Sequence, residues 1–397
     1  MQTKHTYLFF SLPKHDDPYT STPWQLAREL AQHEQVIYVD HPYHFWEAFK
    51  NLFSSKIQWR LKSYVQETTK VVDGVTVLAT PFVWPTHFLP SGRIHRIFTN
   101  RNERLVAKRV NAYLLRRKIS SLVYVNSFEF YFPTIQHLLR VPVHTSVYHC
   151  IDPMVKKYTL KHGPALQQAA AANAQLIITT APALQQQFFD RGFSRVYCIP
   201  NAANFQLFHQ AVNENLPVHP RLPATTKKTI GYLGNIERRI DFQLVLQVLD
   251  ALHDFQLVMA GPVETTYVPT EAMNHPRIHW IGPVAHEDAP AVVKGFDVAI
   301  IPFVVDQVSE SIYPLKLFEY LAAGKPVVAT PFNQSVLVAL KDVVYTAHTA
   351  AQFAQGVQHA AASTSKSEQE KRVSVAKENT WHDRAKQFKQ LIQLQVA

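Results

Sequence analysis

Short apolar runs alternate along the chain with longer segments whose apolar residues recur every three or four positions. In the first half the apolar runs cover residues 6–11, 36–40, 121–127, 143–152, 175–180 and 195–200. In the second half they cover residues 229–235, 255–263, 277–284, 297–303 and 326–329. Such runs are typical of strands buried on both faces, and the periodic segments are typical of amphipathic helices. The alternation predicts an α/β fold with doubly wound, mainly parallel sheets.

A polar, proline-rich stretch separates the two halves of the chain. Residues 211–228 lack apolar periodicity, and clusters of proline and polar residues mark loops. The length of the chain also favours more than one domain. We expect a first domain over residues 1–210, a linker over 211–228, a second domain over 229–378 and a last helix over 379–397.

Composition describes an ordinary globular protein of 397 residues, 47% hydrophobic and 18% charged. Two cysteines, Cys150 and Cys198, lie in apolar runs, which indicates buried thiols in a reducing compartment. No disulfide framework or cysteine metal site is available. The net charge of +10 suits nucleic acid, an anionic membrane or phosphorylated ligands, and composition does not choose among them.

The apolar run at residues 6–11 is too short for a signal peptide. No later run reaches the roughly 18 residues that a membrane-spanning helix needs. We therefore expect a cytoplasmic protein that is soluble or bound peripherally at the inner face of the membrane.

Two segments of the first half combine basic and apolar side chains. Between residues 44 and 62, lysines surround a stripe of large apolar residues, namely Phe45, Trp46, Phe49, Leu52 and Phe53. Between residues 93 and 118, a helix would present one basic face, made of Arg101, Arg104, Lys108, Arg109, Arg116, Arg117 and Lys118. Each segment is either a helix with an inward apolar face and solvated cations, or a surface for anionic lipid. On the second interpretation each basic residue contributes roughly 1 kcal/mol near the membrane.

The stretch from residue 311 to residue 330 organises the second half. It reads as a loop, a helix opened by Pro314, a tight turn at Gly324 and a buried strand over 326–329. Helical spacing predicts a buried face made of Leu315, Phe318 and either Leu321 or Ala322. The same spacing leaves off that face Lys316, Glu319 and Tyr320.

Lys316 and Glu319 lie three residues apart, on one face of this predicted helix. A cation beside the free N–H groups of a helix N-terminus suits a phosphate. A carboxylate one turn later can accept hydrogen bonds from the vicinal hydroxyls of a ribose. The alternative is a surface ion pair on an amphipathic helix.

The helix segment KLFEYLAAGKPVVAT resembles the donor-binding signature of the family-four nucleotide-sugar glycosyltransferases. Four further segments stand in the order of that family's donor domain, namely GYLGN, LVMAGP, WIGPV and DVAIIPF. The resemblance covers most of residues 229–345. It implies the GT-B fold, in which two Rossmann-like domains face each other across a cleft and a last helix crosses back to the first domain.

The resemblance also implies a set of donor-binding residues. Glu319 would hold the nucleotide ribose, and Lys316 with Pro314 and the preceding loop would hold the phosphates. The family pattern has an acid eight residues before the helix glutamate, where this chain has Ser311, with Glu310 next to it. Other backbone and basic groups expected near the donor are Gly234, Arg238, Arg239, Gly282 and Val284.

In the first half, VYHCID resembles a strand end of one branch of the family, and IPNAANFQLF resembles the segment that closes its first domain. We expect Asp152 first, and His149 second, to lie near the reacting carbon. The loop between Pro13 and Thr22 contains no glycine, so the dinucleotide fingerprint is absent. Polar residues in this loop that could contact an acceptor sugar are Asp16, Asp17 and Tyr19.

The expected function is transfer of a sugar from a nucleotide-diphosphate donor to a glycan or lipid-linked acceptor in cell-surface polysaccharide synthesis. The resemblance implies a retaining mechanism without a metal or other cofactor. Two alternatives stay open: a nucleotide-sugar epimerase, and a non-catalytic GT-B scaffold at the membrane, which the serine at position 311 would permit. The basic residues accompany no recognised nucleic-acid module, so we expect no nucleic-acid partner.

Overall fold

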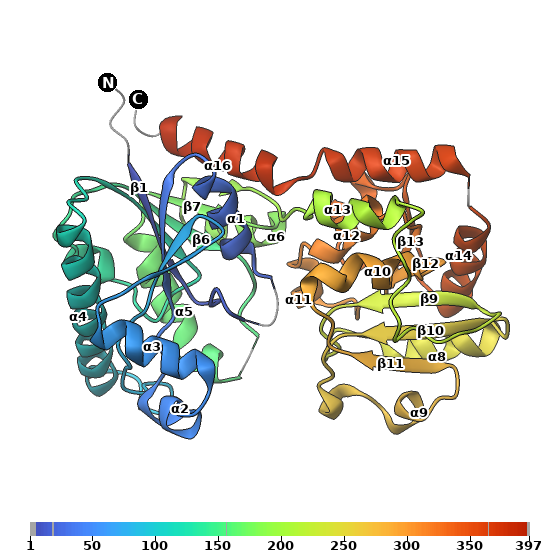
Figure 1. Ribbon diagram of the computed structural model, residues 1–397, viewed down its shortest axis with the longest axis horizontal. Coiled ribbons are helices and arrows are strands. Elements are labelled where there is room, and N and C mark those ends of the chain that lie inside the picture. The colour runs from blue at the N-terminus through green and yellow to red at the C-terminus, as the bar shows by residue number, and fades with distance from the viewer. Residues whose placement is uncertain (1–4, 18–19, 156, 364, 395–397) are drawn as a thin grey trace. The chain divides into compact units, whose positions relative to one another are not determined.

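The computed structural model describes residues 5–17, 20–155, 157–363 and 365–394. The chain forms two compact units, one made of residues 1–200 with 385–397 and the other of residues 201–384 (Figure 1). Each unit has its own parallel sheet. The predicted α/β class with two parallel-sheet domains is therefore confirmed.

The sheet of the first unit has the strand order β3-β4-β2-β1-β5-β6-β7-β8. Every described pairing in it is parallel except that of β3 with β4. The strands are β1 (Thr6–Ser11), β2 (Gln35–Asp40), β3 (Lys70–Val72), β4 (Val75–Leu78), β5 (Leu122–Ser127), β6 (Val143–Cys150), β7 (Leu176–Thr179) and β8 (Val196–Cys198). The helices are α1 (Thr22–Ala31), α2 (Phe45–Lys50), α3 (Ser55–Val65), α4 (Arg93–Arg116), η1 (Ile135–Leu138), α5 (Lys157–Ala172), α6 (Pro182–Asp190) and the last part of α16 (Trp381–Leu394).

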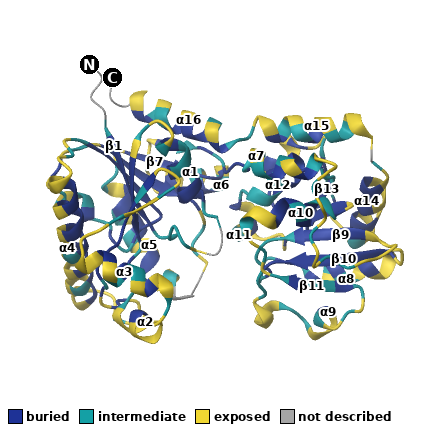
Figure 2. Cartoon of the chain, viewed as in Figure 1, coloured by how far each residue is buried: buried dark blue, intermediate teal, exposed yellow. Residues whose placement is uncertain are grey.

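Two apolar clusters cover the two faces of this sheet, because successive side chains of each strand point to opposite sides. Phe9 of β1 packs in one cluster with helix α1 and with Phe388 of α16. Phe10 packs in the other cluster with α4. The alternation explains why all six residues of β1 are buried (Figure 2).

The sheet of the second unit has the order β11-β10-β9-β12-β13-β14, and all its described pairings are parallel. The strands are β9 (Lys228–Leu233), β10 (Phe255–Ala260), β11 (Ile278–Gly282), β12 (Val298–Ile301), β13 (Val327–Ala329) and β14 (Val344–Thr346). The longer helices are α8 (Phe242–Ala251), α12 (Leu315–Ala322), α14 (Ala350–Ala362) and α15 (Lys366–Lys377). The shorter ones are α7 (Phe205–His209), η2 (Gln210–Val212), η3 (Thr265–Tyr267), α9 (Thr270–Met273), η4 (His286–Asp288), α10 (Ala289–Lys294), α11 (Gln307–Glu310) and α13 (Gln334–Ala339).

The expected linker, residues 211–228, packs on the second unit rather than running free. The Lys294 ammonium donates to the carbonyls of Asn213 and Glu214, at 2.6 and 2.8 Å. Arg221 donates to the carbonyl of Ile281 in β11 and to that of Pro283 just after this strand. The first unit ends at Pro200, ten residues before the expected boundary at residue 210.

Two side chains expected on polar helix faces are buried. Tyr320 is fully buried in α12, and its hydroxyl accepts a hydrogen bond from the Leu233 N–H at 2.8 Å. Leu315, expected on the buried face, is only half-buried. In α4, Arg109 is buried and donates to the carbonyls of Ser63 and Thr68, at 3.2 and 3.3 Å. Helical spacing misplaced these residues because partners on distant segments decide which polar groups can be buried.

Candidate functional site

The carboxyl edge of the second sheet is where a ligand of a doubly wound domain binds. Three of its strands end in glycine turns with left-handed φ angles, Gly234 at +143°, Gly261 at +135° and Gly282 at +69°. A Cβ on Gly261 would lie 2.0 Å from the Gly234 carbonyl oxygen, so only glycine allows the two turns to touch. These turns bring bare backbone together at the edge of the sheet.

Lys316 in the first turn of α12 lies against this backbone. A Cβ on Gly234 would come 2.8 Å from the Lys316 Nζ. The ammonium donates a hydrogen bond to the Tyr232 hydroxyl at 2.7 Å and lies 4.4 Å from the centroid of that ring. The centroid of the Phe303 ring, in the loop after β12, lies 5.1 Å from the same Nζ. Burial lowers the pKa of Lys316 to about 7, and the charge of Arg239 acts in the same direction.

Glu319 lies one helical turn after Lys316, partly buried. Burial raises the pKa of its carboxyl group to about 7, and the charge of Lys316 opposes that rise. Within the described part of the chain, this carboxylate has no hydrogen-bond partner. A hydrogen bond from a ligand hydroxyl to this half-buried carboxylate would be favourable, because the carboxylate has no partner among the described residues.

The two arginines expected near the phosphates differ in their surroundings. The Arg239 guanidinium forms an ion pair with Glu237 and lies 5.5 Å from the Phe303 ring, near the Lys316 ammonium that it influences. Arg238 forms no hydrogen bond or ion pair with the described residues. Arg239 is therefore the better placed of the two to share an anionic ligand with Lys316.

The loop before α12 turns its serine inward. Ser311 is 2% exposed, and its hydroxyl donates to the Gln307 carbonyl at 3.2 Å. Glu310 is exposed, while its carbonyl accepts from the Asn333 side chain at 2.9 Å. Pro314 is the residue that precedes α12, just outside the helix that it was expected to open. The exposed acid next to Ser311 is thus Glu310, the last residue of α11, one position from the family pattern.

The turn at Gly282 is fixed by an arginine that the sequence pattern did not single out. Arg221 donates to the carbonyls of Ile281 and Pro283, both at 2.7 Å, and the Gly261 N–H donates to the Gly282 carbonyl at 2.8 Å. Val284 follows, half-buried. No local sequence pattern predicts this role of Arg221, because the arginine lies 60 residues before its partner Ile281.

The two residues expected near the reacting carbon differ in exposure. Asp152 is exposed just beyond the carboxyl end of β6. His149 is 2% exposed, its Nδ1 lies 2.8 Å from the Ser127 hydroxyl, and its ring packs on Phe388. Burial lowers the pKa of His149 to about 3. His149 is therefore buried beneath Phe388 of α16, and Asp152 is the exposed member of the expected pair.

The loop after β1 is held by a buried ion network. The Arg60 guanidinium donates to both carboxylate oxygens of Asp16, at 2.8 and 2.9 Å, and to Asp40 at 2.7 Å. His15 Nδ1 lies 2.7 Å from the same Oδ2 of Asp40, and the His15 backbone N–H donates to Asp40 Oδ1 at 2.9 Å. Although burial raises the pKa of Asp16, the bonds from Arg60 hold it below its usual value. Asp17 accepts from the Lys14 N–H at 2.8 Å. Tyr19 lies outside the described residues.

Three of these ligand atoms, from His15, Asp16 and Asp40, lie close enough together for a metal ion. The Arg60 guanidinium already bonds both carboxylates. A cation there would have to displace a buried arginine, so the residues fit a structural ion network better than a metal site.

A second acid–histidine pair, not singled out from the sequence, lies at the same edge of the first sheet. His41 follows β2 directly, and its Nδ1 lies 2.6 Å from the Glu129 carboxylate just after β5. Glu129 is 1% exposed, and its other oxygen has no partner among the described residues. The imidazole is 13% exposed beside the Tyr131 ring. The pair could have been predicted from the sequence, because polar residues that follow parallel strands lie at the edge of the sheet where ligands bind.

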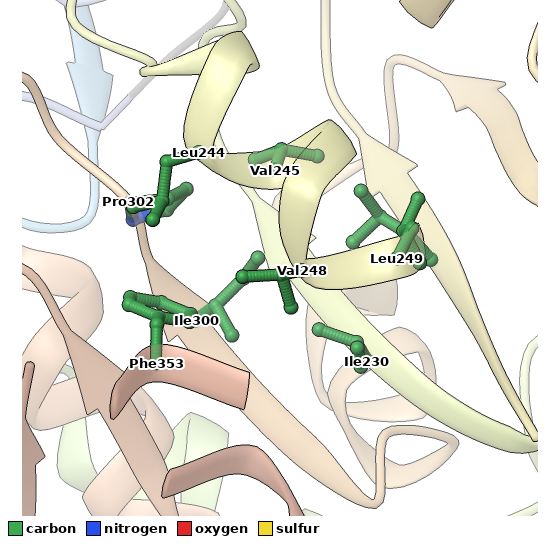
Figure 3. Close-up of a pocket in the computed structure, with 9 residues that line it drawn as sticks. Ile230, Leu244, Val245, Val248, Leu249, Ile300, Pro302 and Phe353 are labelled. Atoms are coloured by element: carbon green, nitrogen blue, oxygen red, sulfur yellow. The ribbon is translucent and has the colours of Figure 1, made fainter. Parts of the chain in front are cut away.

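Two cavities of the second unit lie away from these residues. One is an apolar void of about 10 Å³ between α8, β9, β12 and α14 (Figure 3), no larger than one water molecule. The other, of about 210 Å³, lies at the amino ends of β13 and β14 beside Lys341 and Lys371. Ligands of doubly wound sheets bind at the opposite edge, so the glycine turns and α12 remain the candidate site.

Comparison with known proteins identifies the second half of the chain. Residues 227–363 match the family model of glycosyl transferases group 1. The match covers about a third of the chain. The match includes β9, α12 and all the residues from Gly234 to Glu319 that were expected near the donor. The resemblance inferred from the helix segment and its four companions is thereby confirmed.

A relative from Bacillus subtilis (strain 168) is 29% identical over 141 residues. It is named TuaH, and its name assigns it to teichuronic acid biosynthesis as a glycosyltransferase. The aligned region spans 35% of this chain and 35% of TuaH. The relation is therefore established over about a third of each protein.

Solved structures match the whole chain with low sequence identity. The sucrose-phosphate synthase of Thermosynechococcus elongatus superposes with a TM-score of 0.67 at 15% identity, covering 98% of both chains. Anabaena HepE in complex with UDP superposes with a TM-score of 0.65 at 12% identity, covering 98% of this chain and 99% of its own. At this identity the likeness shows the fold, which is GT-B as expected.

The ion network makes a prediction about stability. Arg60→Ala leaves the Asp40 carboxylate buried without its guanidinium, and the expected loss is about 3–5 kcal/mol of unfolding free energy. Arg28→Ala removes a pair with Asp73 in which the two side chains are 32% and 51% exposed, and should cost about 0–1 kcal/mol. Urea unfolding of both variants measures the difference. Equal losses of unfolding free energy in the two variants would show that the ion network around Arg60 does not stabilise the loop after β1.

Proposed function

We propose that the chain is a glycosyltransferase that moves a sugar from a nucleotide-diphosphate donor to a glycan or lipid-linked acceptor. One observation carries the proposal: a half-buried ammonium and a carboxylate without a partner among the described residues lie one helical turn apart, beside glycine turns, inside the region that matches the group 1 family. Lys316 would bind the diphosphate, with Arg239 beside it, and Glu319 would bind the ribose hydroxyls. The turn at Gly282 and Val284 would contact the base.

The proposed chemistry is transfer with retention of configuration. The bond between the anomeric carbon and the phosphate oxygen breaks, the acceptor oxygen bonds to that carbon, and its proton passes to the leaving diphosphate. Negative charge develops on the diphosphate, and fixed cations aimed at it stabilise the transition state. Lys316, Arg239 and the N-terminus of α12 would supply that charge in this chain, so we propose a reaction independent of a metal or other cofactor.

The acceptor side is assigned to the carboxyl edge of the first sheet. Asp152 is exposed there, and Glu129 with His41 offers a carboxylate-held imidazole that can orient a hydroxyl. Asp17 and Tyr19 remain candidates on the loop after β1. The name of TuaH favours an acceptor in cell-surface polysaccharide synthesis. Such an enzyme would work in the cytoplasm, at the inner face of the membrane.

The first test is binding of nucleoside diphosphates. HepE was solved with UDP and with UDP and glucose, which makes UDP and UDP-sugars the first probes. We expect UDP to raise the apparent stability of the wild type, by about 2.7 kcal/mol at a hundredfold excess over its dissociation constant. Glu319→Gln should lose most of this shift, because the amide cannot accept from both hydroxyls. Thermal denaturation with and without ligand measures it.

Two control variants make this test specific. Glu271→Gln changes an exposed carboxylate of α9, and Asp152→Asn changes the acceptor side, so both should keep the wild-type shift. No shift with any nucleotide in folded wild type would contradict the donor site and favour the scaffold alternative. Sugar epimerisation without an acceptor would favour the epimerase.

A pH dependence follows from the lowered pKa of Lys316. Below pH 7 the lysine is an ammonium, and above it the free protein increasingly holds a neutral amine. An anionic diphosphate favours the ammonium, so affinity should fall by up to about tenfold per pH unit above that pH. The terminal phosphate, with a pKa of about 6, is already ionised in that range.

Isothermal titration of UDP across this pH range measures the slope, and proton uptake from buffers of different ionisation enthalpy confirms its origin. Lys316→Arg is the matched variant, since arginine stays charged and should bind with a flat profile. A wild-type affinity that does not change above pH 7, or the same slope in both proteins, would rule out Lys316 as the diphosphate ligand.

A further inference from the structure

Large apolar side chains gather, exposed, on one part of the first unit. Trp46 and Phe49 of α2 are 69% and 72% exposed, and Phe53 in the following turn is 90% exposed. In Figure 2 most of α2 has the exposed colour, and Ala48 is its one buried residue. The interpretation of residues 44–62 as a helix with an inward apolar face is therefore wrong.

Neighbouring segments extend this exposed group. The Phe45 N–H donates to the Val83 carbonyl at 3.1 Å, and the Phe45 ring lies 5.2 Å from the Trp84 ring. The Asn102 side chain of α4 bonds both backbone groups of Trp84, at 3.0 and 2.8 Å. The loop then leads directly into the first turns of α4. We call the whole set the aromatic surface: Phe45, Trp46, Phe49, Leu52, Phe53, Trp84, Phe88, Ile94 and Ile97.

Exposed apolar area of this size is unfavourable in water, and contiguous patches of it mark interaction surfaces. Most of these side chains project from short, separate segments instead of lining a groove. Phe53 stands almost free of its neighbours. Rings that protrude separately are suited to a deformable partner into which each ring can insert.

The charges around the aromatic surface are nearly all positive. Between residues 45 and 62 and between 84 and 101, the exposed basic residues are Lys50, Lys56, Lys62, Arg93, Arg96 and Arg101. Glu47 is the exposed acid of these segments. Lysine is depleted in protein–protein interfaces, whereas lysine and arginine beside tryptophan and phenylalanine are typical of membrane-interface segments.

We propose that the aromatic surface docks the chain on an anionic lipid bilayer, with its rings in the headgroup layer and its basic residues on the lipid charges. No described helix has the length and apolar character to cross a membrane, so the attachment is peripheral. The proposal rests on exposure and charge in the first unit and is independent of the donor site in the second. It would bring a lipid-linked acceptor to the carboxyl edge of the first sheet.

The test is co-sedimentation of the full chain with vesicles. We expect the wild type to bind vesicles of equal parts phosphatidylglycerol and phosphatidylcholine, and to bind phosphatidylcholine vesicles weakly. A triple variant, Trp46→Ser with Phe49→Ser and Phe53→Ser, should lose at least about tenfold in vesicle affinity, because three buried rings are removed from the lipid. These side chains are exposed, so the variant should fold.

Two further variants separate the contributions. Lys50→Glu with Arg96→Glu should abolish the preference for anionic lipid, and wild-type binding should weaken with salt. Tyr267→Ser with Val338→Ser removes exposed apolar side chains of the second unit and should bind like the wild type. Circular dichroism and the thermal shift with UDP report whether each variant keeps its fold and its donor site.

Three results would overturn the proposal. They are no vesicle binding by the wild type, equal binding to both vesicle types, and unchanged binding by the triple variant. Self-association of the wild type that the triple variant lacks, without vesicle binding, would instead assign the aromatic surface to a second copy of the chain. A lost UDP shift with intact vesicle binding would reject the donor site and leave this proposal standing.

Discussion

The arrangement around α12 in the second unit depends on one constraint, the packing of a half-buried lysine ammonium against glycine backbone. Lys316 can reach the Tyr232 hydroxyl only because Gly234 has no side chain, and Gly234 holds its turn only because Gly261 leaves room for its carbonyl oxygen. A half-buried ammonium with a single hydroxyl partner is incompletely compensated. An anion that binds there would relieve that penalty, which is why the position suits a diphosphate.

The rest of the second unit keeps this arrangement rigid. Tyr320, on the same helix as Lys316, bonds the backbone of Leu233 and so ties α12 to the end of β9. Arg221 ties the turn after β11 in the same way. The first unit holds its own sheet edge by different means, with Arg60 between the carboxylates of Asp16 and Asp40. In both units, side chains from distant segments fix the loops that follow the strands.

Much of the fold could be predicted from the sequence because most strands are apolar runs that stop at a glycine, a proline or a polar residue; the short strands β3, β4 and β14 are not among the predicted runs. The order of the runs after residue 229 predicted β9 to β13 correctly. The places of Lys316 and Glu319 on one face of α12 followed from helical spacing alone. Local pattern was sufficient wherever one segment determines its own structure.

The failures share a physical cause, which is that burial is decided by partners far away in the chain. Tyr320 is buried because its hydroxyl reaches a backbone group 87 residues away. His149 is covered by Phe388, and Arg109 satisfies carbonyls of residues more than forty positions earlier. Conversely, the sequence left open whether Phe53 is buried or exposed, and only the structure shows that the side chain is 90% exposed.

The central claim is that a nucleotide-diphosphate donor binds where α12 begins. Hydrogen exchange of the full chain with and without a UDP-sugar tests it most directly, since bound backbone groups exchange more slowly. The account predicts slower exchange confined to the turns at Gly234 and Gly282 and to residues 311–320. Protection that appears instead around the cavity beside Lys341, or nowhere in the second unit under conditions of saturating ligand, would contradict it.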